Sequence, residues 1–177
     1  MRWQVFPRKW LLITTLGRYV HVSRPGEIQS FPSGAPSEGD TMNAGIRFFE
    51  AIRTGNFLIF TNLLDADPRL IMARDENDWT PLHFIAALGS STTAVHAMMT
   101  KRLIGEGADV NCRTFLGWTP IHILAMQGQK EAADVARILV EGGADLKATD
   151  DRGVGWKLYW QHGEEIRDIF ERAETRG

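Results

Sequence analysis

The spacing of apolar side chains along the chain changes near residue 42. Residues 23–41 are dominated by serine, proline and glycine, with few apolar positions, a composition typical of a linker. Met42 follows the linker, and residues 43–53 are the first segment with the regular apolar spacing of an amphipathic helix. The pattern predicts a folded domain over residues 42–174, preceded by an extension over residues 1–41.

Apolar stripes and polar intervals alternate within this domain. Residues 130–141 predict an amphipathic helix, because three branched apolar side chains fall on one of its faces. They are Val135, Ile138 and Leu139. Residues 90–93, all serine or threonine, offer a cap for another helix. The intervals 71–79 and 110–118 are too short and polar for helices, so we expect turns that project from the helices.

Two motifs recur in the same order in the middle of the chain. Trp-Thr-Pro-Leu-His at 79–83 returns as Trp-Thr-Pro-Ile-His at 118–122, with the threonines 39 residues apart. Gly-Ala-Asp-Val-Asn at 107–111 then returns as Gly-Ala-Asp-Leu-Lys at 143–147. Recurrence of landmarks at such an interval indicates a repeat architecture.

The Trp-Thr-Pro motif predicts the start of a helix, and a glycine that follows each copy predicts the end of that helix. The threonine can cap the helix, and the proline suits the first helical position, where no backbone donor is needed. Counting each threonine as one, the tenth residue is Gly89 or Gly128, which suits the left-handed turn that stops a helix. We therefore expect short inner helices that end at Leu88 and Gln127.

Weaker copies flank these two units. Upstream, residues 49–55 end in a glycine and align with the stretch that ends at Gly89. Downstream, residues 150–153 begin a fourth unit in which the Thr-Pro-Leu-His motif is missing. Terminal repeats are expected to be atypical, because one of their faces meets water instead of a neighbouring unit.

These motifs resemble those of ankyrin repeats over about residues 43–173. The resemblance implies an all-α solenoid of three to four helix-turn-helix units, and it implies binding of a protein partner without a cofactor. We place the units at residues 42–74, 75–113, 114–149 and 150–174. The two motifs lie three residues further apart in the second unit than in the third, so its outer helix or helix joint is expected to be longer. Asp78 stands where the next units have Gly117 and Gly153, at a position expected to have positive φ.

Neither the histidines nor the single cysteine predicts a catalytic or metal site. His83 and His122 are 39 residues apart and lack the spacing of a helical zinc pair. The ankyrin resemblance implies that they bond backbone groups between repeats. Cys112 is the only cysteine, and Arg113 beside it is expected to lower its pKa slightly. No base, oxyanion element, phosphate-binding loop or nucleophile elbow is recognisable, so we expect no enzyme and no small-molecule substrate.

Composition narrows the partner classes and the compartment. The net charge is −2, which argues against nucleic acid, although residues 1–41 carry +2 and the remainder −4. No apolar run is long enough to span a membrane, and residues 10–16 make a poor signal peptide, so secretion is not expected. A single cysteine fits a reducing compartment, and we expect a cytoplasmic protein.

The predicted protein-binding site is an apolar strip across two units. Phe115 and Leu116 fall at the tip of a projecting turn, Trp118 and Trp79 at the roots of two such turns, and Met126 near the end of an inner helix. Exposed apolar patches often mark binding sites. The alternative is that Phe115 and Leu116 fold back onto a neighbouring turn or onto residues 1–20.

The surroundings of this strip suggest the partner's charge. Four acidic residues are expected to form a polar rim that favours a basic surface on the partner. They are Asp75, Glu76, Asp150 and Asp151. Two other functions stay open: a tethered binder whose basic, aromatic residues 1–20 contact a membrane or nucleic acid, and an enzyme with an unrecognised site.

Overall fold

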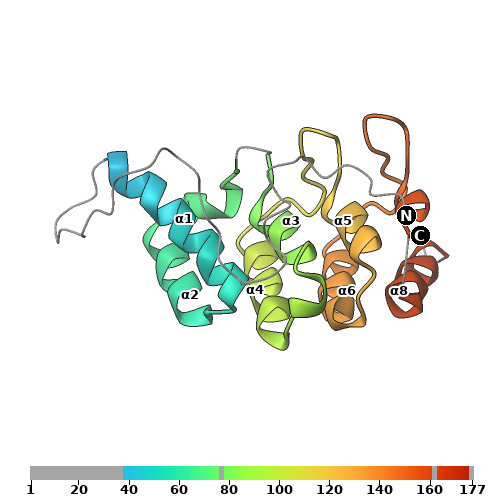
Figure 1. The fold of residues 1–177 in the computed structure, drawn as a ribbon, viewed down its shortest axis with the longest axis horizontal. Helices are drawn as coiled ribbons and strands as arrows, with labels where there is room; N and C mark the ends of the chain where they lie inside the picture. Colours follow the sequence, from blue (N-terminus) through green and yellow to red (C-terminus); the bar gives the residue numbers. More distant parts are fainter. Residues whose placement is uncertain (1–37, 76–77, 161–162, 176–177) are drawn as a thin grey trace, which may run out of the picture. The chain divides into compact units, whose positions relative to one another are not determined.

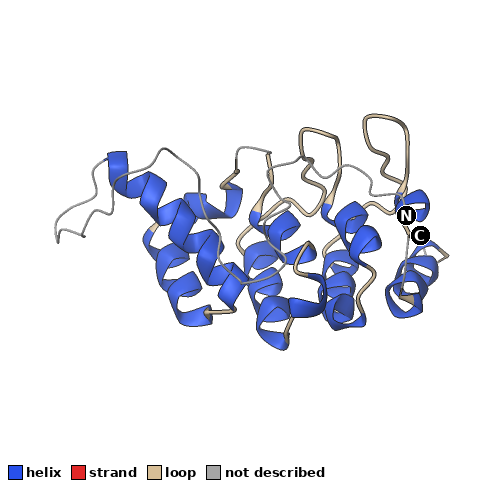
Figure 2. Ribbon diagram, in the orientation of Figure 1, coloured by secondary structure: helices blue, strands red, loops and turns tan. Residues whose placement is uncertain are grey.

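The computed structural model describes residues 38–75, 78–160 and 163–175. These residues form two rows of α-helices with no strand among them (Figures 1 and 2). The inner row is α1 (Glu38–Thr54), α3 (Pro81–Ala86), α5 (Pro120–Gln127) and α7 (Trp156–Tyr159). The outer row is α2 (Phe57–Ala66), α4 (Ala94–Gly105), α6 (Ala133–Glu141) and α8 (Glu164–Glu174). Short 3-10 turns lie at η2 (Pro68–Met72), η3 (Gly89–Ser91) and η4 (Lys130–Ala132).

Each unit contributes one helix to each row, and neighbouring units pack along both rows. The loops before α5 and α7 extend past the inner row on the same side, at the top of Figure 1. This arrangement confirms the predicted all-α repeat solenoid. The chain forms it because no single pair of helices can bury its apolar face without a neighbour.

The helices begin at the predicted threonines. Thr80 and Thr119 precede α3 and α5, each with a proline at the first helical position and a histidine that completes a capping box. The predicted left-handed glycines after these helices are also present, since Gly89 and Gly128 have φ of 54° and 56°. Helix α3 nevertheless ends at Ala86, two residues before the expected Leu88, because its last residues continue as a turn.

Helix α1 begins at Glu38, five residues before the predicted start at 43. Its first residues are polar, so apolar spacing could not reveal that they are helical. Residues 1–37 lie outside the described residues, and with them most of the predicted extension.

The additional residues of the second unit lie in its outer helix. Helix α4 has 12 residues and α6 has 9, while Gly89 precedes α4 by the same number of residues as Gly128 precedes α6. The joints between inner and outer helices therefore have equal lengths, and α4 alone is longer.

The core lies between the two rows. Ile85, Leu124 and Leu139 are fully buried there, and burial of each such side chain contributes about 1.5–3 kcal/mol. The terminal units add aromatic pairs: Phe48 stacks on Phe60 with ring centroids 5.0 Å apart. In the last unit, α8 buries only Ile166 and Phe170 and exposes charged side chains. Such a polar outer face is what ends a repeat array in water.

Candidate functional site

The three loops that precede α3, α5 and α7 have the same hairpin conformation. We call them loop 1 (75–79), loop 2 (114–118) and loop 3 (150–154). In each, the first residue's N–H donates to the fifth residue's carbonyl, at 3.1, 2.9 and 2.9 Å. The side chain of the first residue accepts from the fifth residue's N–H. The fourth residue is left-handed, with φ of 60° at Asp78, 77° at Gly117 and 76° at Gly153, as expected for Asp78. The loops are thus built alike, although residues 76–77 of loop 1 lie outside the described residues.

Asp150 is part of this hairpin, so its predicted place in an exposed acidic rim is wrong. It is 4% exposed and accepts hydrogen bonds from the N–H groups of Arg152 and Val154 and from the hydroxyl of Tyr159. Desolvation raises its pKa, but these hydrogen bonds outweigh it and hold the pKa well below its usual range. The sequence could have predicted this role, because Asp150 aligns with Asp75 and Thr114, the first residues of loops 1 and 2.

The other described acidic residues of the predicted rim lie beside arginines, so this surface carries both signs of charge. Exposed Asp151 pairs with Arg113 at 3.2 Å, and half-buried Asp75 accepts from the Trp79 N–H. Glu76 lies outside the described residues. Arg74 donates to the carbonyls of Asp78 and Arg113, at 3.0 Å each, and so ties loop 1 to the residue just before loop 2.

His83 and His122 each join two units, which confirms their structural role. The Nε2 of His83 lies 2.9 Å from the Trp118 carbonyl oxygen, and that of His122 lies 3.2 Å from the Val154 carbonyl oxygen. Their Nδ1 atoms accept from the N–H groups of the capping threonines, at 3.2 Å in both cases. Burial lowers the pKa of His83 to about 4. Both rings therefore fit the neutral form that donates from Nε2.

His96 has the same role on an outer helix, although the sequence did not lead us to predict it. Its Nδ1 accepts from the Thr93 N–H at 2.9 Å, and its Nε2 lies 2.8 Å from the Ile52 carbonyl oxygen in the first unit. Phe49 stands where the first unit would carry an inner histidine, six residues before its glycine. The signal was present, because Thr93 and His96 repeat the threonine-to-histidine spacing of the main motif.

The five predicted binding residues differ in how much surface they offer. Phe115 is 53% exposed at the tip of loop 2. Leu116, Trp79 and Met126 are half-buried and pack partly against the core. Trp118 is only 9% exposed, and its Nε1 donates to the Tyr159 hydroxyl at 3.0 Å. The apolar surface at loop 2 therefore centres on Phe115, while Trp118 closes the base of the loop through its hydrogen bonds with Thr114.

Cys112 is buried beside the capping group of α3. Its Sγ lies 3.1 Å from the Thr80 Oγ1 and 3.7 Å from the His83 Nδ1. Desolvation raises the pKa of the thiol to about 11, so the expected lowering by Arg113 is wrong. A buried, protonated thiol is a poor nucleophile.

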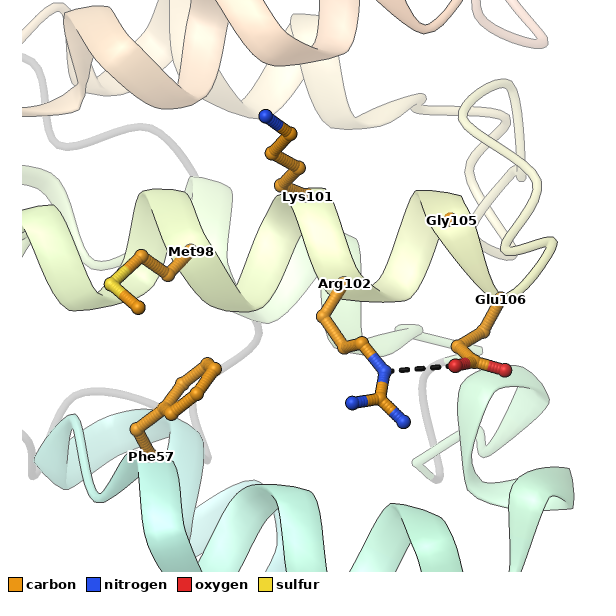
Figure 3. Close-up of a pocket in the computed structure, with 6 residues that line it drawn as sticks. All are labelled: Phe57, Met98, Lys101, Arg102, Gly105 and Glu106. Atoms are coloured by element: carbon orange, nitrogen blue, oxygen red, sulfur yellow. Dashed lines mark hydrogen bonds and ion pairs between the residues drawn. The ribbon is translucent and has the colours of Figure 1, made fainter.

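A second apolar feature is a groove between α2 and α4 on the outer row (Figure 3). Phe57 and Met98 point toward one another across it, and Met98 is 53% exposed. Further along, Arg102 pairs with Glu106 at 2.8 Å and with Asp65 at 2.7 Å. In the close-up, Lys101 points away from this pair, toward the opposite side of α4.

Two kinds of site are absent from the described residues. No group of three or more His, Cys, Asp or Glu side chains in these ranges is placed to hold a metal ion. In the same part of the chain, no helix combines the length and apolar character needed to cross a membrane.

The paired helices, the capping motif and the projecting loops define a helical-repeat protein of the solenoid class. The family model for ankyrin repeats (3 copies) matches residues 48–150, more than half of the chain. The chain belongs to the ankyrin-repeat family. Ankyrin repeats generally act as protein–protein interaction modules and are typically non-enzymatic. A search of the curated proteins found no match for this chain.

Proposed function

We propose that the chain binds a protein partner through the surface centred on Phe115, and that it acts as an adaptor or as an inhibitor that masks its partner. One observation carries the proposal: a large aromatic side chain is 53% exposed at the tip of a loop of defined conformation. Leu116, Trp79 and Met126 add half-buried apolar surface, and Trp118 closes loop 2 through its hydrogen bonds with Thr114.

The loop's rigidity favours binding. Arg74 donates to the Asp78 carbonyl in loop 1 and to the carbonyl of Arg113, the residue just before loop 2. Loop 2 is held to loop 3 by the Asp151 N–H, which donates to the Leu116 carbonyl at 3.3 Å. A side chain on a fixed backbone loses less conformational entropy when it enters a partner's pocket. Aromatic residues so placed are frequent hot spots, whose truncation costs about 2 kcal/mol or more of binding energy.

The charges around Phe115 suggest a partner surface of mixed sign. Asp78 and Asp151 are exposed on one hand, and Arg74 and Arg113 on the other. With Asp150 buried, the case for a basic partner is weaker than the sequence indicated. Complementary charges at such a rim mainly set the orientation and rate of association.

Affinity capture from the source cell tests this proposal. The full chain is compared with Phe115→Ala and with the double change Phe115→Ala and Leu116→Ala. Leu58→Ala is the matched control, because Leu58 is 69% exposed on α2 and does not line the groove between α2 and α4. We expect proteins captured by the wild type and by Leu58→Ala to be lost with the Phe115 variants, while the thermal melting of Phe115→Ala stays nearly unchanged. Retained capture together with a lower melting temperature would contradict the proposal, since Phe115 would then serve folding.

The groove between α2 and α4 is the second candidate surface. Met98 supports it, because an exposed thioether facing Phe57 across an open groove suits an apolar side chain of a partner. Loss of capture with Met98→Ala, and not with Phe115→Ala, would move the binding site to this groove.

A tethered binder remains the alternative function, and it depends on residues 1–20, which lie outside the described residues. Binding to anionic vesicles and to nucleic acid, measured for the full chain and for a chain that starts at residue 36, tests it directly. Binding by the full chain alone would support tethering, and equal weak binding by both would count against it.

A further inference from the structure

Each of the three joints between units contains one buried histidine that bonds across it. His96 joins the first and second units through the Ile52 carbonyl, at 2.8 Å. His83 joins the second and third units through the Trp118 carbonyl, at 2.9 Å, and His122 joins the third and fourth through the Val154 carbonyl, at 3.2 Å. The first joint takes its histidine from an outer helix, because Phe49 replaces the inner one.

The same ring nitrogen has the same task at every joint. Each Nδ1 accepts from the N–H of a threonine at a helix start, at 3.2 Å for Thr80, 2.9 Å for Thr93 and 3.2 Å for Thr119. An accepting Nδ1 leaves the hydrogen on Nε2, which donates to the carbonyl of the neighbouring unit. A second proton can enter only at Nδ1, where it would face the threonine N–H and break that half of the capping box.

The surroundings offer the charged form little compensation. Desolvation is the largest cause of the lowered pKa of all three histidines. It lowers the pKa of His83 to about 4. The positive charges of Arg74 near His83 and of Arg113 near His122 act in the same direction. The buried Cys112 thiol also lies near His83, and the Tyr159 ring packs against His122. The negative charge of Asp150 raises the pKa of His122 and so opposes the lowering by burial. At His96, burial lowers the pKa and the bond to the Ile52 carbonyl raises it.

We propose that these three histidines make the repeat stack an acid-sensitive switch, in which protons compete with the bonds that join the units. The units are coupled at neutral pH and come apart as the pH falls. Because His83 holds the joint between loops 1 and 2, acid also takes apart the surface around Phe115. That last consequence rests on the proposed function, whereas the pH dependence of folding does not.

The direction of the effect follows from the lowered pKa values. An unfolded histidine titrates near 6.5, and these three titrate below that value when folded. Their contribution to stability is therefore fully present above about pH 6.5 and is lost as the pH falls toward the folded pKa. Between pH 7.5 and 5.5, each histidine that stays neutral in the fold raises the unfolding equilibrium constant by about tenfold.

Urea unfolding of the full chain at pH 7.5 and pH 5.5 tests the switch. We compare the wild type with His83→Gln, His96→Gln and His122→Gln, because glutamine can keep a donor near the Nε2 position and does not titrate. Leu139→Ala is the matched control, since it loosens the buried core without changing a titratable group. The wild type and the control should lose stability in acid by the same factor, and each histidine variant should lose up to about tenfold less.

A histidine NMR titration of the folded wild type keeps the test decisive if a variant does not fold. We expect three rings to carry the hydrogen on Nε2 at neutral pH and to titrate below the ordinary value of about 6.5 in the fold, His83 near pH 4. Three rings that titrate near their ordinary pKa in the fold would overturn the proposal. Equal losses of stability in acid for the wild type and all three variants would overturn it as well.

Discussion

The indole Nε1 of Trp118 donates a hydrogen bond to the hydroxyl oxygen of Tyr159 at 3.0 Å, across the joint between the third and fourth units. The same hydroxyl donates to Asp150 and accepts from Arg152. Tyr159 thus connects loop 2 with loop 3. The fourth unit lacks the Thr-Pro-Leu-His motif, and this tyrosine supplies bonds across its joint in addition to the His122 bond.

Tyr159→Phe should lower the free energy of unfolding by about 1–3 kcal/mol, because it leaves the buried Trp118 Nε1 without its acceptor and Asp150 with one donor fewer. Urea unfolding at neutral pH measures the change. Trp118→Phe in the same background completes a double-mutant cycle, in which the two changes together should cost less than their sum. Strict additivity would show that the bond contributes nothing.

Asp78→Gly should be neutral or should stabilise by at most about 1 kcal/mol. Asp78 has φ of 60°, which glycine adopts more easily, although glycine also gives the unfolded chain more freedom. Chemical denaturation compares the variant with the wild type, and Asp78→Ala serves as the control that keeps the φ and loses the polar group. A clear drop in the midpoint for the glycine variant would mean that the Asp78 carboxylate stabilises loop 1.

The Cys112 thiol should react slowly with iodoacetamide in the folded protein at pH 8. A pKa raised from 9.0 to about 11 reduces the thiolate fraction roughly 100-fold, and burial slows access further. Mass spectrometry follows the modification, with the urea-unfolded chain as the control. Comparable rates in both states would show that the thiol is exposed and ionised as in a free peptide.

A chain that starts at residue 36 should melt at the same temperature as the full chain, because it keeps all of α1. A chain that starts at Met42 removes the first four residues of that helix, and we expect a small decrease in melting temperature. Loss of a cooperative transition in the residue 36 chain would show that the preceding residues belong to the folded core. Equal melting of all three would show that the start of α1 adds no stability.

Local rules were enough to predict the repeat and the starts of α3 and α5 from the sequence. A threonine before a proline caps a helix, a glycine ends it in a left-handed turn, and Asp78 aligned with two glycines implied positive φ. Caps and helix ends depend on residues within about one helical turn of each other, so the local sequence is enough to predict them. The extent of α1 was missed, because the polar residues at its start carry no apolar spacing.

Burial and cross-unit contacts were decided by the tertiary structure. Asp150 and Asp151 are adjacent and chemically alike, yet one is enclosed by Tyr159 and loop 3 while the other is exposed and pairs with Arg113. Desolvation raises the pKa of Cys112 and outweighs the lowering by the Thr80 hydroxyl and by Arg74, both far from Cys112 along the chain. His96 bonds to a carbonyl 44 residues away, a distance over which sequence spacing carries no geometry. The sequence by itself determined which units repeat and how α3 and α5 begin, because a cap depends on neighbouring residues, whereas packing between units determined which side chains are left to meet a partner.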